Sequence, residues 1–297
     1  MTKQLIAVVG PTASGKTDLA IRLAQHFQTE ILSADSRQFF KEMSIGTAKP
    51  DDQQLEMVPH HFIGSHSIQE EMNAGVFEHL AIKQLDRVYK KHAIALLVGG
   101  SGLYIQALTQ GLDSVPESSQ KMREQLMLEL EQHGIGRLLD ELALKDPVYF
   151  EQVDRDNPHR VIRALEVIRL SGQPFSAFRQ QNPKPRDFRT IKLGIVMERE
   201  VLYDRINRRV DSMMDQGLLK EVESLLPFKH LPALQTVGYK ELFHHLEGKV
   251  TLDNAVEQIK QNTRRFAKRQ LTWFRADPSI VWVKSEQEAL SLLRIRA

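Results

Sequence analysis

The sequence of 297 residues contains no cysteine. Without cysteine the chain cannot form a disulfide scaffold, a thiolate metal site or a cysteine nucleophile, and this composition fits a reducing compartment. Long apolar runs are missing as well. Residues 93–98 form one of the longest, far short of the roughly 20 residues that cross a bilayer, and residues 5–9 are too short for the core of a signal peptide. We therefore expect a cytoplasmic protein that does not span a membrane.

A strong excess of one charge is also absent, because the formal net charge is only +2. The charge is distributed unevenly, however. Residues 258–276 contain six lysines and arginines and no carboxylate. A local positive field of this kind suits an anionic polymer such as a nucleic acid.

The apolar residues, 41% of the chain, are enough for a substantial core. Short apolar runs predict buried strands at residues 5–9, 31–34, 93–98, 191–196 and 280–283. Helical patterns alternate with these strands, which favours a parallel sheet. The expected fold class is therefore α/β: a P-loop NTPase-like parallel sheet core with a helical insertion domain and a helical C-terminal region.

Helical spacing dominates the middle of the chain. Residues 118–132 and 137–144 have helical patterns, and Asn157 followed by Pro158 is typical of a helix start, with Asn157 as the N-cap. Residues 181–189 read as a connector. The expected domains are a core of residues 1–113 and 190–297, and a helical insertion of residues 114–189.

One motif carries chemistry by itself. Gly10-Pro11-Thr12-Ala13-Ser14-Gly15-Lys16-Thr17 fits the phosphate-loop pattern G-x-x-x-x-G-K-[ST], with a strand before it and a helix after it. The glycines let backbone N–H groups point at a phosphate, and the helix N-terminus adds partial positive charge. Lys16 places a charge against phosphate oxygens, and the Thr17 hydroxyl can bind Mg²⁺. The motif, common in ATP-binding proteins, predicts phosphate binding but leaves the reaction open, since kinases, hydrolases and transferases share it.

An acidic residue is expected near this loop. The strand at residues 93–98 ends in Gly99-Gly100-Ser101-Gly102 and has no acid there, and the Asn-Lys-x-Asp segment of GTPases is missing. Asp35 instead follows the strand at residues 31–34, and in a doubly wound sheet that strand end shares an edge with the phosphate loop. The alternative is that Asp35 merely caps a turn.

Several motifs occur in a fixed order along nearly the whole chain. They are the phosphate loop, Asp35-Ser36-Arg37-Gln38, Ile45-Gly46-Thr47-Ala48-Lys49-Pro50, Val58-Pro59-His60-His61, Gly99-Gly100-Ser101-Gly102-Leu103-Tyr104, residues 157–166, Gln235-Thr236-Val237-Gly238-Tyr239 and residues 263–270. This ordered set resembles the tRNA dimethylallyltransferase (tRNA isopentenyltransferase) family. The resemblance implies transfer of a dimethylallyl group from dimethylallyl diphosphate to the exocyclic N6 amine of the adenine just 3′ of the anticodon, in tRNAs that read codons beginning with U.

The resemblance also implies roles for individual residues. The diphosphate would lie on residues 10–17, with Mg²⁺ as cofactor held at Thr17, and Asp35, Lys16 and Thr17 would be catalytic, with Asp35 taking the proton of the amine. Asp35, Ser36, Arg37 and Gln38 would line the base pocket. The insertion would contact the anticodon stem-loop, and the remaining tRNA contacts would be Ser101, Arg123, His159, Arg160, Val161, Ile162 and Arg163.

Two further helices offer cations. On the helix predicted at residues 252–274, Lys260, Arg264 and Lys268 form a row without acidic partners at i±4, so we expect Arg264 and Lys268 to contact tRNA rather than only solvent. Val256, Ile259, Phe266 and Trp273 would face the core. On the helix predicted at residues 200–216, Arg205 is the candidate that reaches the diphosphate.

Other observations leave alternatives open. An Arg163–Glu166 pair on a solvated helix face would explain that helix without tRNA. The pair His60-His61 invites a metal hypothesis, but adjacent side chains point apart and no second ligand set has the right spacing, so a structural role is favoured. The sequence departs from the family pattern at Phe40, Ser44 and His159, which concerns the tRNA side more than the chemistry.

Three other functions remain as alternatives: an isopentenyltransferase acting on free adenine nucleotides, a P-loop small-molecule kinase, and a non-catalytic RNA-binding module. The basic helix and the insertion count against the first, because a free nucleotide needs neither. The missing acid after Val98 counts against the second, and an intact phosphate loop with Asp35 against the third. No interface pattern is evident, so we expect a monomer.

Overall fold

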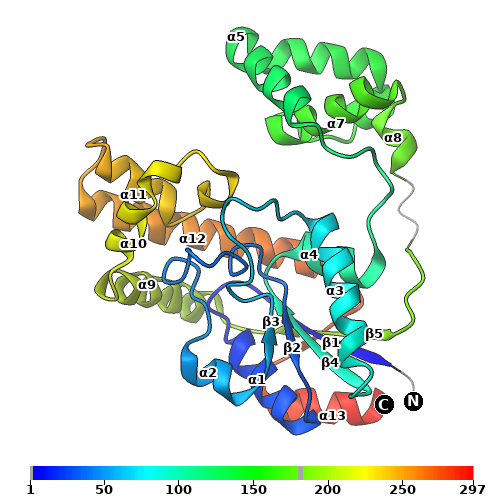
Figure 1. Ribbon diagram of the computed structural model, residues 1–297, viewed down its shortest axis with the longest axis vertical. Coiled ribbons are helices and arrows are strands. Elements are labelled where there is room, and N and C mark those ends of the chain that lie inside the picture. The colour runs from blue at the N-terminus through cyan, green and yellow to red at the C-terminus, as the bar shows by residue number, and fades with distance from the viewer. Residues whose placement is uncertain (1–2, 180–182, 297) are drawn as a thin grey trace. The chain divides into compact units, whose positions relative to one another are not determined.

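The computed structural model describes residues 3–179 and 183–296. The chain divides into two compact units, Met1–Gln110 with Pro185–Ala297 (unit 1) and Gly111–Lys184 (unit 2). The sequence had placed these boundaries at 113/114 and 189/190. Two residues of the predicted connector, 181 and 182, lie outside the described residues. Figure 1 gives the labels of the elements.

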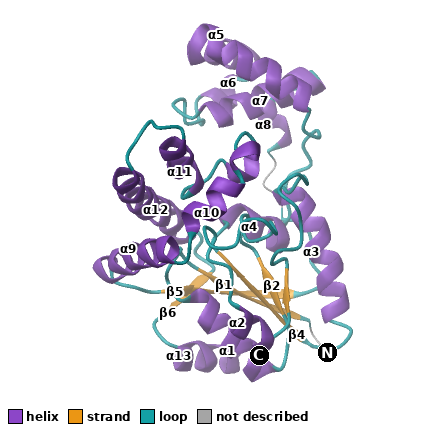
Figure 2. Ribbon diagram, turned by 60° about the vertical axis from the view of Figure 1, so that its left-hand side comes forward, coloured by secondary structure: helices purple, strands orange, loops and turns teal. Residues whose placement is uncertain are grey.

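Unit 1 is built on a six-stranded parallel sheet with the order β3-β2-β4-β1-β5-β6 (Figure 2). The strands are β1 (Gln4–Val9), β2 (Ile31–Ser33), β3 (His60–His61), β4 (Ile94–Gly99), β5 (Arg189–Ile195) and β6 (Ile280–Val283). The parallel α/β class is therefore confirmed. The two-residue strand β3 was missed because it is too short to show any periodicity.

Helices cover both faces of this sheet. On one face α3 (Ala74–Val88), α4 (Gly102–Gln110) and the end of α12 (Leu252–Arg275) pack on Leu5, Ala7 and Val9 of β1. On the other face α1 (Lys16–Phe27) and α13 (Glu286–Arg296) pack on Ile6 and Val8. Both sets of β1 side chains are buried, as expected for a central strand of a parallel sheet.

A second core in unit 1 joins helices that follow the sheet. It contains residues of α9 (Arg199–Asp215), α10 (Leu218–Ser224), α11 (Tyr239–Leu246) and α12. The short elements of unit 1 are α2 (Asp52–Met57) and the 3-10 turns η1 (Leu226–Phe228) and η2 (Pro232–Leu234).

The predicted inner face of α12 is wrong in its C-terminal half. Phe266 and Trp273 are 40% and 46% exposed, and Ala267, Gln270 and Phe274 are buried instead. Consecutive helical residues point about 100° apart because a turn takes about 3.6 residues. The prediction took the larger of two neighbouring side chains as the buried one. That choice was enough to rotate the predicted buried face of α12 by one residue.

Unit 2 is entirely helical among its described residues. It consists of α5 (Gln120–Lys145), α6 (Pro147–Phe150), α7 (Pro158–Ser171) and α8 (Phe175–Phe178). Gly134 interrupts α5 with φ of 72°, which explains why the sequence showed two helical patterns there. Leu138, Leu142, Val161 and Leu165 belong to a core of its own.

The start of α7 and the ends of unit 2 each show a local detail. Asn157 precedes Pro158 as predicted, but its side chain makes no capping hydrogen bond. A Cβ added to Gly111 would lie 2.6 Å from the Lys184 side chain. The chain therefore leaves unit 1 and returns to it along neighbouring segments.

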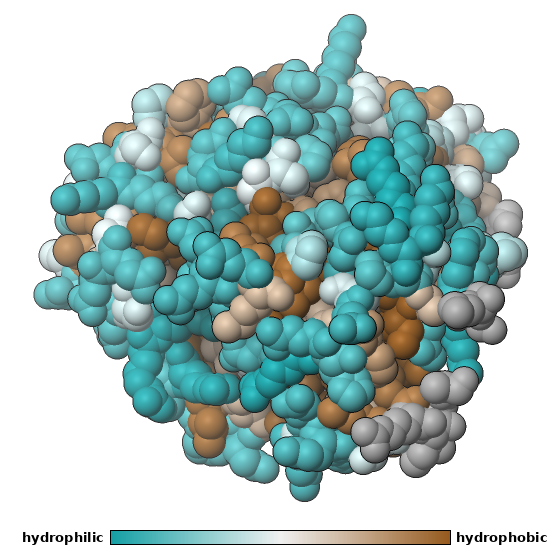
Figure 3. All heavy atoms as spheres, turned by 60° about the horizontal axis from the view of Figure 1, so that its bottom comes forward, coloured by the Kyte–Doolittle hydropathy of each residue, from teal (hydrophilic) through white to brown (hydrophobic). Residues whose placement is uncertain are grey.

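No described helix combines the length and the apolar character needed to cross a membrane. The face drawn in Figure 3 is mostly hydrophilic, with hydrophobic residues scattered among polar ones.

Candidate active site around the phosphate loop

The phosphate loop connects β1 to α1 at the carboxyl edge of the sheet, as the motif predicted. Gly15 immediately precedes α1 with φ of 82°, a left-handed conformation that favours glycine. Lys16 lies across the loop and donates from Nζ to the Pro11 carbonyl at 3.2 Å. Ser14 is 2% exposed, and no described atom pairs with its buried Oγ. The loop is thus curled in the way that phosphate binding requires.

Burial alters the charge chemistry of Lys16. Burial lowers the pKa of its ammonium to about 8, Asp35 opposes this shift, and Arg209 adds to it. An approaching anion would restore the charged form because it offsets the lost hydration.

A cavity of about 190 Å³ opens in front of the loop, and we call it the phosphate-loop cavity. It brings Thr12, Ala13, Gly15, Lys16 and Thr17 together with Asp35. Gly10, Pro11 and Ser14, which were also predicted to bind diphosphate, are buried behind this surface and do not line it. The remaining lining residues are Asp18, Gln38, Thr47, Ala48, Lys49, Pro50, Gln54, Val98, Gly99 and Arg209.

Asp35 lies just past β2, facing the loop. Its Oδ1 accepts the Arg37 N–H at 3.0 Å, so it does cap a turn, the alternative considered from the sequence. It nevertheless lines the phosphate-loop cavity. Ser101 fixes the next residue, because its Oγ accepts the Ser36 N–H at 2.9 Å. The carboxylate is therefore held in place and still open to a ligand.

A second cavity of about 200 Å³, the inner cavity, adjoins the first. Both are lined by Thr12, Asp35 and Arg209, and by Thr47 and Ala48. The remaining inner-cavity residues are Ser36, Arg37, Gly46, Ser101, Val210, Met213, Thr236, Val237, Gly238, Ile259, Thr263, Phe266 and Gln270. The two cavities thus meet at the carboxylate, which stands between a phosphate cradle and a space with several apolar walls.

Helix α9 supplies arginine to the loop, but not only the one predicted. Arg205 lines a shallower cavity with Ala13 and Gly15. Arg209, one turn later, lines that cavity and both of the others, and its Nη1 lies 3.4 Å from the Thr12 Oγ1. Burial lowers the pKa of Arg209, and so does neighbouring Arg205. The i, i+4 spacing of Arg205 and Arg209 was the signal that could have revealed Arg209.

Gln270 is a second residue that the sequence did not reveal as part of the site. Its Oε1 accepts the Thr12 N–H at 2.9 Å, and its Nε2 donates to the Gly100 carbonyl at 2.9 Å. One amide from α12 therefore ties the phosphate loop to the end of β4. A buried polar residue between Ala267 and Phe274 on the inner stripe was the available signal.

The predicted base-pocket residues gather around Asp35. Ser36, Arg37 and Ser101 line the inner cavity, and Gln38 lines the phosphate-loop cavity. The Gln38 amide donates to the Thr47 and Ala48 carbonyls at 3.2 and 3.0 Å, so it holds the wall of the site. Their contact with tRNA stays a prediction.

In unit 2, two predicted tRNA ligands bind a carboxylate. Glu166 is fully buried and accepts from Arg163 at 2.7 Å and from Arg123 at 3.2 Å. Burial opposes its ionisation, but hydrogen bonds from Arg163 and Ser118 outweigh this and lower its pKa. The Arg163–Glu166 pair of the alternative is therefore present, but the solvated face on which it was placed is wrong, because Glu166 is fully buried.

The other predicted positions of α7 differ in exposure. His159 and Arg160 are exposed, whereas the Val161 and Ile162 side chains are buried in the core of unit 2. Only the backbone of the latter two remains for a contact with tRNA.

The basic row on α12 is less uniform than predicted. Lys260 binds Asp211 of α9 at 2.8 Å and Glu257 at i−3 at 3.1 Å, so its charge is paired although the i±4 positions hold no acid. Arg264 donates to the Asn207 Oδ1 at 2.6 Å. Lys268 is exposed, and no described residue pairs with its ammonium.

The histidine pair is structural, as favoured. His61 binds Glu30 at 2.6 Å, and His60 contacts the Val58 carbonyl through Nδ1 at 2.7 Å. Among the described residues no group of three or more histidines and acids could hold a metal ion. Of the departures, Phe40 is buried in the second core, and the Ser44 N–H binds Glu221 at 3.0 Å.

The parallel sheet, its phosphate loop and the helical unit inserted before β5 define a P-loop-like α/β protein. The model of the IPP transferase family matches residues 38–277. The chain belongs to this family, and the resemblance drawn from the ordered motifs is confirmed.

Curated relatives are similar over nearly their full length. The chain is 51% identical to the tRNA dimethylallyltransferase of Christiangramia forsetii, over 98% of this chain and 97% of that protein. It is 45% identical to tRNA dimethylallyltransferase 1 of Bacteroides thetaiotaomicron, over 98% and 96%. Both alignments therefore extend over the phosphate loop that precedes the family match.

Solved structures agree with this assignment. The full-length tRNA isopentenylpyrophosphate transferase from Bacillus halodurans matches with a TM-score of 0.71 at 35% identity, covering 99% of this chain and 95% of that one. A eukaryotic dimethylallyltransferase acting on tRNA matches with a TM-score of 0.78 at 27% identity, covering 96% and 75%.

Proposed function

We propose that this chain transfers the dimethylallyl group of dimethylallyl diphosphate to the N6 amine of the adenine 3′-adjacent to the anticodon, in tRNAs reading codons that begin with U. The observation that carries the proposal is the meeting of the phosphate-loop cavity and the inner cavity at Asp35. The named activity of relatives at 51% and 45% identity agrees with it.

The phosphate side of the site assists the departure of the diphosphate. The bond between the allylic carbon and the bridging oxygen breaks, and negative charge grows on the diphosphate. Loop N–H groups, Lys16 and Arg209 lie where they can stabilise that charge, with Arg205 further out. Such preorganised donors are worth several kcal/mol, on the order of 10²–10³-fold in rate for one donor.

The fit of Mg²⁺ follows from the side chains present. Thr17 offers a hydroxyl beside the carboxylates of Asp18 and Asp35 in the same cavity, and hard oxygen ligands suit this ion. When bound, Mg²⁺ would supply further neutralisation of the leaving diphosphate.

The acceptor side explains the need for a carboxylate. The adenine leaves its stack in the anticodon loop, which costs a few kcal/mol, and enters the inner cavity. Its N6 lone pair forms the new bond to the allylic carbon, and Asp35 accepts the proton that N6 loses. We also propose that the protein acts as a monomer in the cytoplasm.

The decisive experiment supplies labelled dimethylallyl diphosphate and Mg²⁺ with tRNA, AMP or ATP as acceptor. We expect label on tRNA alone. Label on AMP would support the free-nucleotide isopentenyltransferase instead, and phosphate transfer from ATP would support the kinase.

A variant pair tests the base. Asp35→Asn should lower kcat by about 10²–10⁴-fold, the usual contribution of a general base. Asp215→Asn, an exposed aspartate at the end of α9, is the matched control and should behave as wild type. Equal kcat for the two variants would remove Asp35 from the mechanism.

A further inference from the structure

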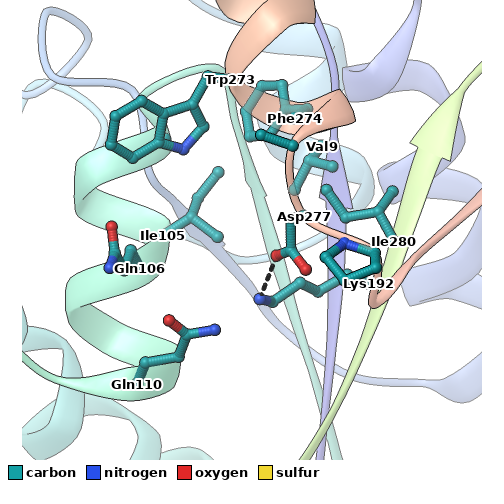
Figure 4. A pocket seen from close by; sticks show the side chains of 12 residues that line it. Val9, Ile105, Gln106, Gln110, Lys192, Trp273, Phe274, Asp277 and Ile280 are labelled. Atoms are coloured by element: carbon teal, nitrogen blue, oxygen red, sulfur yellow. Dashed lines mark hydrogen bonds and ion pairs between the residues drawn. The ribbon is translucent and has the colours of Figure 1, made fainter. Parts of the chain in front are cut away.

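A further cavity, of about 380 Å³, lies in unit 1 and shares no lining residue with the two cavities of the reaction site. Figure 4 shows it between α4, the end of α12 and the strands of the sheet. Its floor is apolar, with Val9, Ile105 and Ile280 among its members. We call it the tryptophan cavity after Trp273.

The tryptophan cavity adjoins the reaction site. Gln270 and Ser101 line the inner cavity, whereas Trp273 and Gly102 line the tryptophan cavity. Trp273 therefore comes one helical turn after Gln270, about 5 Å further along α12, and Gly102 is the residue after Ser101. The two cavities are thus lined by neighbouring residues at the start of α4 and on α12.

The indole of Trp273 is held in a fixed place. A Cβ added to Gly102 would lie 2.1 Å from the indole Nε1, so the ring occupies the room that a side chain at this position would take. It remains 46% exposed. A large aromatic ring that is both packed on one side and open on the other offers a preformed stacking surface.

Polar groups also line this cavity. Gln106 and Gln110 come from successive turns of α4, and Figure 4 shows the Gln110 amide directed toward Lys192 and Asp277. Within residues 3–179 and 183–296, neither amide nor the indole N–H has a hydrogen-bond partner. They offer both donors and acceptors to a ligand, as the edge of a heterocycle requires.

The charge inside this cavity is already balanced. The Lys192 ammonium binds the Asp277 carboxylate at 2.6 Å, and the lysine side chain is only 8% exposed. A phosphate would therefore find no uncompensated cation here. A flat, neutral and polar-edged ligand fits the chemistry better.

We propose that the tryptophan cavity binds a nucleobase. The ring of Trp273 provides the stacking face, and Gln106 and Gln110 contact the edge of the base. Because the cavity adjoins the reaction site, the occupant is a nucleotide next to the adenine that is modified. The assignment to an RNA nucleotide rests on the proposed function, since only an RNA acceptor carries a second base next to the modified adenine.

The test uses anticodon stem-loop RNA in which each nucleotide flanking the target adenine is replaced, one at a time, by an abasic nucleotide. Trp273→Ala should raise KM for the intact RNA by about 5–100-fold, since stacking on an aromatic residue is worth about 1–3 kcal/mol per base. KM for dimethylallyl diphosphate should stay unchanged. With the abasic nucleotide at the occupying position, Trp273→Ala should cause no further loss.

Two variants separate stacking from folding. Trp273→Phe keeps an aromatic face and should retain most of the affinity. Trp282→Phe, at the other tryptophan, does not line the cavity and should match wild type. An equal loss in Trp273→Phe and Trp273→Ala, together with a changed KM for dimethylallyl diphosphate, would indicate a structural role and overturn the proposal.

Free nucleosides test whether the bound base belongs to the RNA or to a free nucleoside. In the Trp282→Phe protein, Trp273 is the only tryptophan, so its emission reports on the cavity. Quenching by adenosine or uridine that intact RNA abolishes supports an RNA base. Quenching that RNA leaves unaffected would show a nucleobase site for free nucleosides and overturn the RNA assignment.

Two results would contradict the nucleobase site itself. One is an unchanged KM of Trp273→Ala for every RNA, and the other is Trp273 emission that no nucleoside alters. Binding of the RNA can also be measured as a Kd without turnover. The nucleobase site therefore remains testable even if the labelled diphosphate is not transferred.

Discussion

At the scale of single residues, the lowered pKa of Lys16 has a measurable consequence. Free lysine loses its proton near pH 10.4, whereas burial brings the pKa of Lys16 to about 8. The lowered pKa means that the cation is nearly complete well below pH 8, is half lost near pH 8 and disappears as the pH rises further. We expect KM for dimethylallyl diphosphate to rise about tenfold per pH unit above pH 8 and to be flat below it, in initial-rate measurements. KM for tRNA, measured in parallel, is the control, and a flat diphosphate profile from pH 7 to 9.5 would contradict this assignment.

A second residue, Glu221, acts on the wall of the site from outside both cavities. Its carboxylate accepts the backbone N–H groups of Ser44, Ile45 and Gly46 at 2.8–3.0 Å, and the Tyr239 hydroxyl at 2.7 Å. Gly46 lines the inner cavity, and the next two residues line both cavities. Glu221 thus positions a loop of the site without contacting either space.

Removal of this carboxylate should cost stability and catalysis together. Glu221→Ala leaves three backbone donors without their acceptor, so we expect a loss of about 1–3 kcal/mol in the free energy of unfolding, measured in urea. Glu221→Gln keeps one acceptor oxygen, so its free energy of unfolding should lie between the values of wild type and Glu221→Ala. Glu223→Ala, an exposed glutamate two residues away on α10, is the control. A Glu221→Ala protein as stable and active as this control would refute the positioning role.

At the scale of elements, α12 contributes differently along its length. Gln270 ties it to the phosphate loop, Lys260 is neutralised by Asp211 and Glu257, and Lys268 is exposed. Of these three side chains, only that of Lys268 is both charged and free to contact a phosphate of tRNA.

The two lysines form a matched pair for an experiment on salt dependence. Lys268→Ala should weaken tRNA binding and flatten the slope of log K against log salt by about 0.7–0.9 for each lost phosphate contact. Lys260→Ala should leave the slope unchanged because its charge is already paired. Filter binding at several salt concentrations measures both. Identical slopes of log K against log salt for the two variants would show that Lys268 contacts only solvent.

Local patterns were sufficient for most elements and failed where a partner came from elsewhere in the chain. The strand, loop and helix around Lys16 follow from adjacent residues, and so does the place of Asp35 at a strand end. Gln270 and Arg209 reach the loop from far along the sequence. Local signals single out both residues, but these signals do not show that the phosphate loop is their partner. The buried face of α12 was predicted wrongly because the larger residue, Phe266, was chosen over Ala267 as the buried one. In the structure, packing against the rest of unit 1 buries Ala267 instead.

At the scale of the whole molecule, each unit has its own hydrophobic core. The division into a sheet unit and a helical unit could be predicted from the change in periodicity. The Arg163–Glu166 pair, three residues apart on one helix, could be predicted, whereas the contact of Arg123 with Glu166 could not, because it joins residues 43 positions apart. Those contacts are why the tRNA roles of Arg123 and Arg163 remain predictions.

Separate cores predict separate responses to mutation. Leu165 is fully buried in unit 2, and Leu165→Ala should destabilise that unit by about 2–5 kcal/mol. KM for dimethylallyl diphosphate should stay within about twofold of wild type, since the phosphate loop belongs to unit 1. Thermal unfolding and initial rates measure the two effects. Leu170→Ala, at a 41% exposed position of the same helix, is the control, and a large rise in the diphosphate KM of Leu165→Ala would show that the units do not behave independently.

The neighbouring segments at Gly111 and Lys184 give the chain a modular layout. Because the polypeptide departs and comes back along one path, the helices between these points can lengthen, shrink or be exchanged while every strand of the sheet keeps its neighbours. Evolution, or a protein engineer, could therefore edit this one cassette and leave the phosphate loop and the sheet that carries it untouched.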